Sequence, residues 1–274
     1  MVGVLFALLT AAQALAQTQN LQTHPAPLNN GEDFTRPVWR LEVKERYENL
    51  PDAHGLNPEK WVTTLRGDGW VGLEEGWRLY GRVDVPLVRS NDVTSSFNPD
   101  GDTTFGLGDL LTESVVLLPE FQRFGSGAGL RVIWPTASLN EAGTGKLQLG
   151  PVVGLRANLP EISPGSFLLT QIRYLNSIAS RNENKGRANV NELDIQPKLN
   201  IGLPDSWFIA AYASESIQIS FADDNKIFLP LDLMAGKKIA RHWILSLDYS
   251  RELYHDKDFE PYDWQLEGRL AYIW

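Results

Sequence analysis

Residues 38–50 are VWRLEVKERYENL, and their side chains alternate in character along the chain. Trp39, Leu41 and Val43 occupy one set of positions, with Glu45 as the exception, and charged residues lie between them. Successive side chains of a β-strand point to opposite faces, so one face of this segment is apolar and the other is charged. The pattern predicts a strand that separates an apolar environment from an aqueous one.

The same two-sided pattern recurs along the rest of the chain. In the eighth such segment, Leu193, Ile195 and Leu199 share one face, while Asp194 and Lys198 share the other. The fourth, seventh and ninth segments are less regular. The expected strands are 38–50, 59–73, 76–89, 104–118, 127–137, 145–159, 166–178, 189–203, 206–219, 227–240, 242–254 and 261–274. We therefore expect an all-β chain that forms a single antiparallel transmembrane β-barrel of about twelve strands.

The lengths of the connections favour a membrane barrel over a soluble β-sandwich, which also has alternating strands. Short connections contain Glu74-Glu75, Pro204-Asp205 and Ala240-Arg241, whereas 90–103, 179–188 and 255–260 are longer and polar. Outer-membrane barrels have short periplasmic turns and long outer loops. An even number of strands then places both termini on the periplasmic side.

The tryptophans add a second criterion, because they fall at the ends of the expected strands. Aromatic rings settle at both membrane–water interfaces, where the ring meets hydrocarbon and its polar edge stays wet. A soluble core would scatter them through the strand middles. The interface girdle is expected to contain Trp39, Trp77, Trp207, Trp243 and Trp274 near the periplasmic rim, and Trp134 and Trp264, with Trp61, near the outer rim.

The N-terminal residues predict export. Residues 2–9 are an uninterrupted apolar run, and Ala14-Leu15-Ala16 resembles a signal-peptidase site. The Lys or Arg that usually precedes such a run is missing here. We expect a signal peptide at 1–16, a flexible periplasmic lead-in at 17–36, and the outer-membrane barrel at 37–274.

The overall composition excludes several classes of protein. The formal net charge is −9, which argues against a nucleic-acid partner. The chain has no cysteine, and a closed barrel needs no disulfide because every strand edge is paired. The mean hydropathy is −0.24, as expected where apolar and polar positions alternate.

The C-terminal residues also follow the alternating pattern. Gly268, Leu270, Tyr272 and Trp274 occupy successive alternate positions. This ending is similar to the terminal strand that outer-membrane barrels present to the barrel-assembly machinery. We expect that machinery, outer-membrane lipids and lipopolysaccharide to be partners of the chain.

Two motifs resemble one known family. Residues 105–110, FGLGDL, and residues 143–151, GTGKLQLGP, are similar to segments of the "MetA-pathway of phenol degradation" family of outer-membrane transporters. The position after the lysine is usually aromatic in that family and is Leu147 here. The resemblance implies a barrel from about residue 75 onward and the passage of small molecules, including hydrophobic or aromatic ones.

The polar faces of the strands supply the candidate site. Interleaved charges of both signs favour a conduit that orients a passing solute, or a salt-bridged lumen that holds the barrel together. The candidates for lining the lumen are Arg40, Glu42, Lys44, Arg46, Arg78, Arg82, Asp109, Arg131, Arg173, Asp194, Lys198, Glu267 and Arg269. We expect a passive outer-membrane channel without cofactor, metal or catalytic residues. The alternatives are a lipid-modifying enzyme and a non-conducting structural barrel.

The enzyme alternative depends on a histidine beside a serine. His242 and Ser246 can share a strand face, but a polar rim histidine is the simpler interpretation. Acidic residues gather in the outer loops, as at Asp256, Asp258 and Glu260. The sequence leaves open whether these loops bind divalent cations. It also leaves open the solute, the oligomeric state and whether the lumen is plugged.

Overall fold

The computed structural model describes residues 30–51, 56–95, 98–180, 189–212, 215–222, 224–257 and 259–274. Its strands are β1 (Arg40–Asn49), β2 (Glu59–Gly72), β3 (Arg78–Asn91), β4 (Thr104–Leu107), β5 (Leu110–Leu117), β6 (Phe124–Trp134), β7 (Lys146–Asn158), β8 (Phe167–Ser180), β9 (Asn191–Gly202), β10 (Trp207–Ala211), β11 (Ile217–Ser220), β12 (Lys226–Lys238), β13 (Trp243–His255) and β14 (Trp264–Ile273). Single 3-10 turns occur at η1 (Glu74–Gly76), η2 (Asn140–Ala142) and η4 (Pro204–Ser206). No helix in this part of the chain is both long enough and apolar enough to cross a membrane.

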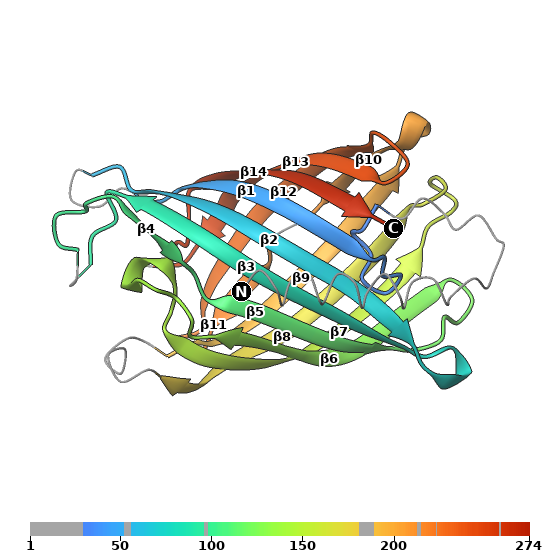
Figure 1. The fold of residues 1–274 in the computed structure, drawn as a ribbon, viewed down its shortest axis with the longest axis horizontal. Coiled ribbons are helices and arrows are strands. Elements are labelled where there is room, and N and C mark those ends of the chain that lie inside the picture. Colours follow the sequence, from blue (N-terminus) through green and yellow to red (C-terminus); the bar gives the residue numbers. More distant parts are fainter. Residues whose placement is uncertain are drawn as a thin grey trace, which may run out of the picture.

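The strands form one sheet that closes on itself (Figure 1). All pairs are antiparallel, and β1 pairs with β2 on one side and with β14 on the other. β4 and β5 share one position in the wall, and β10 and β11 share another. The wall is therefore a closed antiparallel barrel of 12 strands, which confirms the predicted fold class.

The three irregular segments have local causes. In the fourth, Gly108 and Asp109 separate β4 from β5, and the Gly108 amide donates to the carbonyl of Pro86 at 2.8 Å. In the ninth, residues 212–216 separate β10 from β11. In the seventh, the pairing of β7 with β8 shifts register beside Ile178. Each irregularity breaks the period of two, and this is why alternation fades there.

Both ends of the barrel are defined by the chain connections. Arg40 pairs with Ile273, so the first and last strands meet at one end. The connections 73–77, 203–206 and 239–242 lie at this end, toward the right of Figure 1. Longer connections, including 92–103 and 135–145, lie at the opposite end.

The distribution of polarity is the inverse of that in a soluble protein. On β1 the side chains of Leu41 and Val43 are 46% and 43% exposed, whereas those of Arg40 and Glu42 are 6% and 3% exposed. The barrel exterior is thus apolar and its interior is charged. A small apolar cluster also lies inside, near the end where β14 terminates, and contains Phe208, Ala210, Met234, Ile244, Ala271 and Ile273.

The expected lead-in differs from the structure where it is described. Residues 1–29, which include the expected signal peptide, lie outside the described residues. Residues 30–36, however, contain the buried side chains of Asn30, Glu32, Asp33 and Thr35, which bond to groups inside the barrel. A free periplasmic lead-in therefore does not describe this segment, because it enters the lumen.

Candidate functional site

The interior of the barrel holds a polar cavity of about 320 Å³. It lies between the inward faces of the strands and residues 30–36. Among the described residues, nine cationic side chains line it: Arg40, Lys44, Arg46, Arg66, Arg82, Arg131, Arg173, Lys198 and Arg269. Six anionic side chains line it: Glu32, Asp84, Glu113, Asp194, Glu215 and Glu267. The cavity wall is therefore cationic, although the whole chain has a formal net charge of −9.

The richest ion-pair network surrounds Arg269 on β14. Its guanidinium contacts Glu267 at 2.5 Å, Asp248 at 2.7 Å and Glu32 at 3.1 Å. Lys44 on β1 adds a contact of 3.0 Å to Glu267. All of these side chains are almost fully buried, and buried charges persist only when they are paired and hydrogen-bonded. This side of the lumen is consequently a cross-linked structural unit.

A second ion-pair network extends along the lumen over β2, β3, β5 and β6. Arg131 on β6 contacts Glu113 at 2.6 Å. Arg66 contacts Asp84 at 2.9 Å, and Arg82 forms an ion pair with the same carboxylate. Glu42 also lies 3.3 Å from Arg66, so three carboxylates are in contact with these three arginines.

Arg173 is a fourth arginine of this network. Arg173 on β8 lies 3.4 Å from Asp194, and it donates to the hydroxyl of Ser216. Ser216 belongs to the segment between β10 and β11, and its neighbour Glu215 contacts Arg46 at 2.7 Å. The interruption of the ninth wall strand thus brings polar groups into the lumen.

Residues 30–36 fill the lumen at the end where β1 begins. Glu32 accepts from Lys198 at 2.7 Å and from Arg269 at 3.1 Å. The Asn30 amide donates to the side-chain oxygen of Asn200 at 2.8 Å. This segment is tied to β9 and β14 by side chains that lie far from it in the sequence.

The same segment is also fastened at the rim. Arg36 donates to both carboxylate oxygens of Glu120, at 2.9 and 2.8 Å. Burial raises the pKa of Glu120, but the hydrogen bonds and charges of Arg36 and Arg156 outweigh it and bring this pKa to about 2. Arg156 also lies 3.2 Å from Asp33. The pairing of Glu120 therefore persists at all pH values well above 2.

Small residues on the barrel wall make room for the segment. Phe34 packs against Tyr80, with ring centroids 6.2 Å apart. A Cβ at Gly154 would lie only 2.2 Å from the Phe34 ring, so any other residue at 154 would displace it. A Cβ at Gly125 on β6 would lie 2.9 Å from the Thr35 hydroxyl. The absence of side chains at these glycines leaves space in the lumen for residues 30–36.

The structure brings together most of the predicted lumen residues. Ten of the thirteen candidates line the cavity: Arg40, Lys44, Arg46, Arg82, Arg131, Arg173, Asp194, Lys198, Glu267 and Arg269. Glu42 is buried behind them, 3.5 Å from Arg40 and 3.3 Å from Arg66. Whether any of them acts on a solute stays a prediction.

Two candidates lie away from the cavity. Arg78 is near the rim, 3.8 Å from Glu120, and donates to the carbonyl of Thr35. Asp109 anchors the connection between β6 and β7, because its carboxylate accepts from the amides of Ala137 at 3.0 Å and Thr144 at 2.7 Å. Asp109 follows the break after β4, so the alternation that assigned it to the lumen does not extend to it.

The girdle residues form two groups at opposite ends of the barrel. Trp39 and Trp274 stack at 6.2 Å, and Trp243 packs edge-on to Tyr272 at 5.1 Å. Trp77 and Trp207 lie in the connections and strand starts of the same end. At the other end Trp264 packs on Tyr47 at 5.2 Å, and Trp134 is the last residue of β6. That these levels coincide with membrane interfaces remains a prediction.

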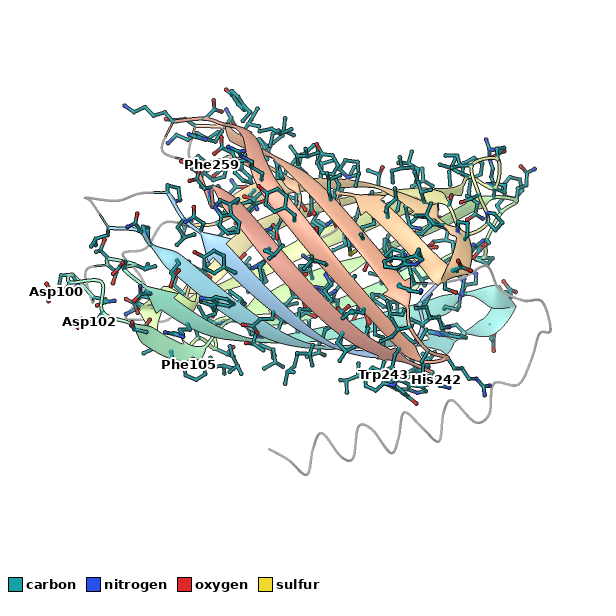
Figure 2. The ribbon with its side chains drawn as sticks, turned by 90° about the horizontal axis from the view of Figure 1, so that it is seen from above. Asp100, Asp102, Phe105, His242, Trp243 and Phe259 are labelled. Atoms are coloured by element: carbon teal, nitrogen blue, oxygen red, sulfur yellow. The ribbon has the colours of Figure 1, made fainter. Side chains whose placement is uncertain are left out.

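Figure 2 shows the same separation: Asp100, Asp102, Phe105 and Phe259 lie at one end, and His242 and Trp243 lie at the other. His242 directs Nδ1 to the carbonyl of Ile273 at 2.8 Å and stacks on Tyr272. Its ring is thus engaged by β14 and not by Ser246. His24 and His54 lie outside the described residues.

The chain matches no protein-family model and no curated protein sequence. An outer membrane channel from Pseudomonas putida F1 has a similar structure, with 14% identity and a TM-score of 0.62, covering 93% of this chain and 98% of that one. The NanC porin matches with 10% identity and a TM-score of 0.53, covering 85% and 98%. The outer membrane phospholipase A from Escherichia coli matches with 10% identity and a TM-score of 0.47, covering 94% and 96%. At these identities, the first two similarities establish a shared closed-barrel fold.

Proposed function

We propose that the chain is a passive channel of the outer membrane. The observation that carries this proposal is the inverted barrel: apolar side chains cover its outside, and a charged cavity lies within it. Apolar residues that face outward on a closed barrel match a hydrocarbon layer, and the closed wall satisfies its backbone hydrogen bonds internally. Under this proposal the end with the short connections and both barrel termini faces the periplasm, and lipopolysaccharide surrounds the other.

The charges that line the cavity favour small anionic solutes as the molecules that pass through it. Its lining has nine cationic side chains against six anionic ones. Rings of charged side chains select ions of the opposite sign in narrow pores. The apolar lining consists of Phe34, Tyr80, Leu111 and Leu169 together. The hydrophobic or aromatic solutes implied by the family resemblance would therefore pass best if they also carry a carboxylate.

Residues 30–36 set the width of this channel. They fill part of the lumen and hold Glu32 against Lys198 and Arg269. A long side chain bridges much of a barrel of this size, so a chain segment inside it leaves only a narrow path. We expect a low conductance that depends on how firmly this segment is held.

The test is the current through the refolded protein in planar bilayers. The wild type should conduct weakly, and its reversal potential in a KCl gradient should show a preference for anions. Glu32→Gln removes one acid from the lining and one anchor of the segment, so it should raise both the conductance and the anion preference. Glu161→Gln, at an exposed ion pair with Arg123, is the matched control and should change neither. A folded wild type without current would contradict the channel and leave a structural barrel.

A further inference from the structure

Three metal-ligating side chains meet at the outer end of β13, away from the lumen cavity. His255 Nδ1 lies 2.7 Å from a carboxylate oxygen of Glu252, and its Nε2 lies 3.7 Å from a carboxylate oxygen of Glu260. One ligand atom from each residue falls within 4.8 Å of the others. Their side chains are 18–31% exposed, so an ion can reach them from the outer medium.

A β-bulge creates this arrangement. Residues three apart on a regular strand point to opposite faces, so Glu252 and His255 would normally be separated by the barrel wall. In β13, Tyr254 pairs with Leu229 but Glu252 pairs with Pro230, so Leu253 is an additional residue in the wall. Leu253 and Tyr254 are both exposed, at 57% and 51%. The bulge therefore restores Glu252 and His255 to the same side, as bulges do when they redirect a side chain.

The third side chain comes from the connection between β13 and β14. The amide of Glu252 donates to the carbonyl of Asp263 at 3.1 Å, which holds the returning chain beside β13. Glu260 reaches His255 from this connection. Phe259, next to it in sequence, lies at the outer end of the barrel in Figure 2. The three residues thus join two separate parts of the outer rim.

The types of ligand point to a transition metal. Imidazole suits Zn²⁺, Ni²⁺ and Co²⁺, whereas Ca²⁺ and Mg²⁺ prefer oxygen ligands alone. Zn²⁺ binds nitrogen and carboxylate oxygen at about 2.0–2.2 Å, so its ligand atoms lie roughly 3.3–3.5 Å apart in a tetrahedron. The two carboxylates approach different nitrogens of His255, so one ion would use a single nitrogen. The three ligand atoms lie within 4.8 Å of one another and would have to move closer together to reach that spacing. Three protein ligands leave a further position for water or for a solute group.

We propose that Glu252, His255 and Glu260 form a binding site for Zn²⁺ or a similar divalent transition metal, and that the ion clamps the β13–β14 connection onto the barrel mouth. This connection carries Tyr262, whose ring packs edge-on to Phe228 at 5.0 Å inside the barrel. The hydroxyls of Tyr262 and Ser250 lie 2.8 Å apart. Metal binding would therefore hold the connection that places Tyr262 against Phe228 and Ser250.

Calorimetry on the refolded full chain with ZnCl₂ tests the site. The wild type should bind one Zn²⁺, and His255→Gln or Glu260→Gln should weaken this binding by roughly tenfold or more, because one of three ligands is lost. His242→Gln, at the opposite rim, is the matched control and should bind like the wild type. Since the chain has no cysteine, thiolates cannot account for the binding. Equal affinity in His255→Gln and the wild type would overturn the site.

Proteolysis tests the clamp separately. Lys257 is an exposed trypsin site in the connection that the ion would hold. Zn²⁺ should slow cleavage there in the wild type and in His242→Gln, but not in His255→Gln. Binding without protection of Lys257 would overturn the clamp. Protection by Ca²⁺ equal to that by Zn²⁺ would overturn the assignment to a transition metal.

Discussion

Val43→Arg tests most directly which face of the barrel meets lipid. Val43 lies on the outer face of β1, midway between Trp39 and Tyr47, and its side chain is 43% exposed. Four residues of strand span about 14 Å, or about 10 Å of height at a tilt of about 40°. The apolar band of such barrels is about 25 Å tall, so Val43 lies near its middle. An arginine at this depth should lower the free energy of unfolding by about 2–4 kcal/mol.

Urea unfolding in lipid vesicles measures this loss, and Val43→Met is the control that changes the size of the side chain without adding charge. Lys44→Met gives the comparison for the opposite face. It removes the partner of Glu267, but Arg269 still neutralises that carboxylate, so the loss should be smaller than for Val43→Arg. The reversal potential of the Lys44→Met channel in a KCl gradient should show a weaker preference for anions, because one positive charge is lost from the lumen. The assignment of faces is refuted if Val43→Arg is as stable as Val43→Met, or if Lys44→Met is the more damaging change.

The remaining two predictions concern topology and assembly. Asp102→Cys should react with a membrane-impermeant maleimide on intact cells and Glu74→Cys should not, because they lie at opposite ends of the barrel; the reverse result would invert the orientation. Replacing both Tyr272 and Trp274 with Ser removes ring contacts to Trp243 and Trp39, each worth about 0.5–1.5 kcal/mol beyond the area buried. We expect a smaller fraction of the double variant to migrate as heat-modifiable folded barrel on gels. Phe121→Ser, at an exposed position, is the control. Migration of the double variant like the wild type would contradict the prediction.

The strands were predictable because each one lies between two environments. The expected segments 59–73 and 145–159 contain β2 and β7 almost end to end. Alternation fades in the fourth, seventh and ninth segments, where the wall is irregular, and Glu45 is an exception within the regular strand β1. Asp109 shows the limit: it would face the lumen if β4 and β5 were continuous, but it follows the break and bonds to Thr144.

The position of residues 30–36 inside the lumen could not be predicted from the alternation of side chains. Glu32 and Asp33 precede the first strand and belong to no periodic pattern, so composition alone assigned them to a lead-in. Their partners, Lys198, Arg269 and Arg156, are distant in sequence and become neighbours only when the barrel closes. The local signals were the inward glycines Gly125 and Gly154, which leave space for Thr35 and for the Phe34 ring.

The charged lumen can serve both as a structural network and as a conduit, because its charges are paired locally while its lining is cationic as a whole. Around Arg269, the carboxylates of Glu267 and Glu32 are shared with Lys44 and Lys198, so this network holds the wall and residues 30–36 together. Along β2, β3, β5 and β6, Asp84 is shared between Arg66 and Arg82, and Arg131 pairs with Glu113. The lining nevertheless has nine cationic side chains against six anionic ones, so an anion that enters the cavity meets an excess of positive charge. The paired charges therefore hold the barrel together, and we expect the excess of cations to favour a passing anion.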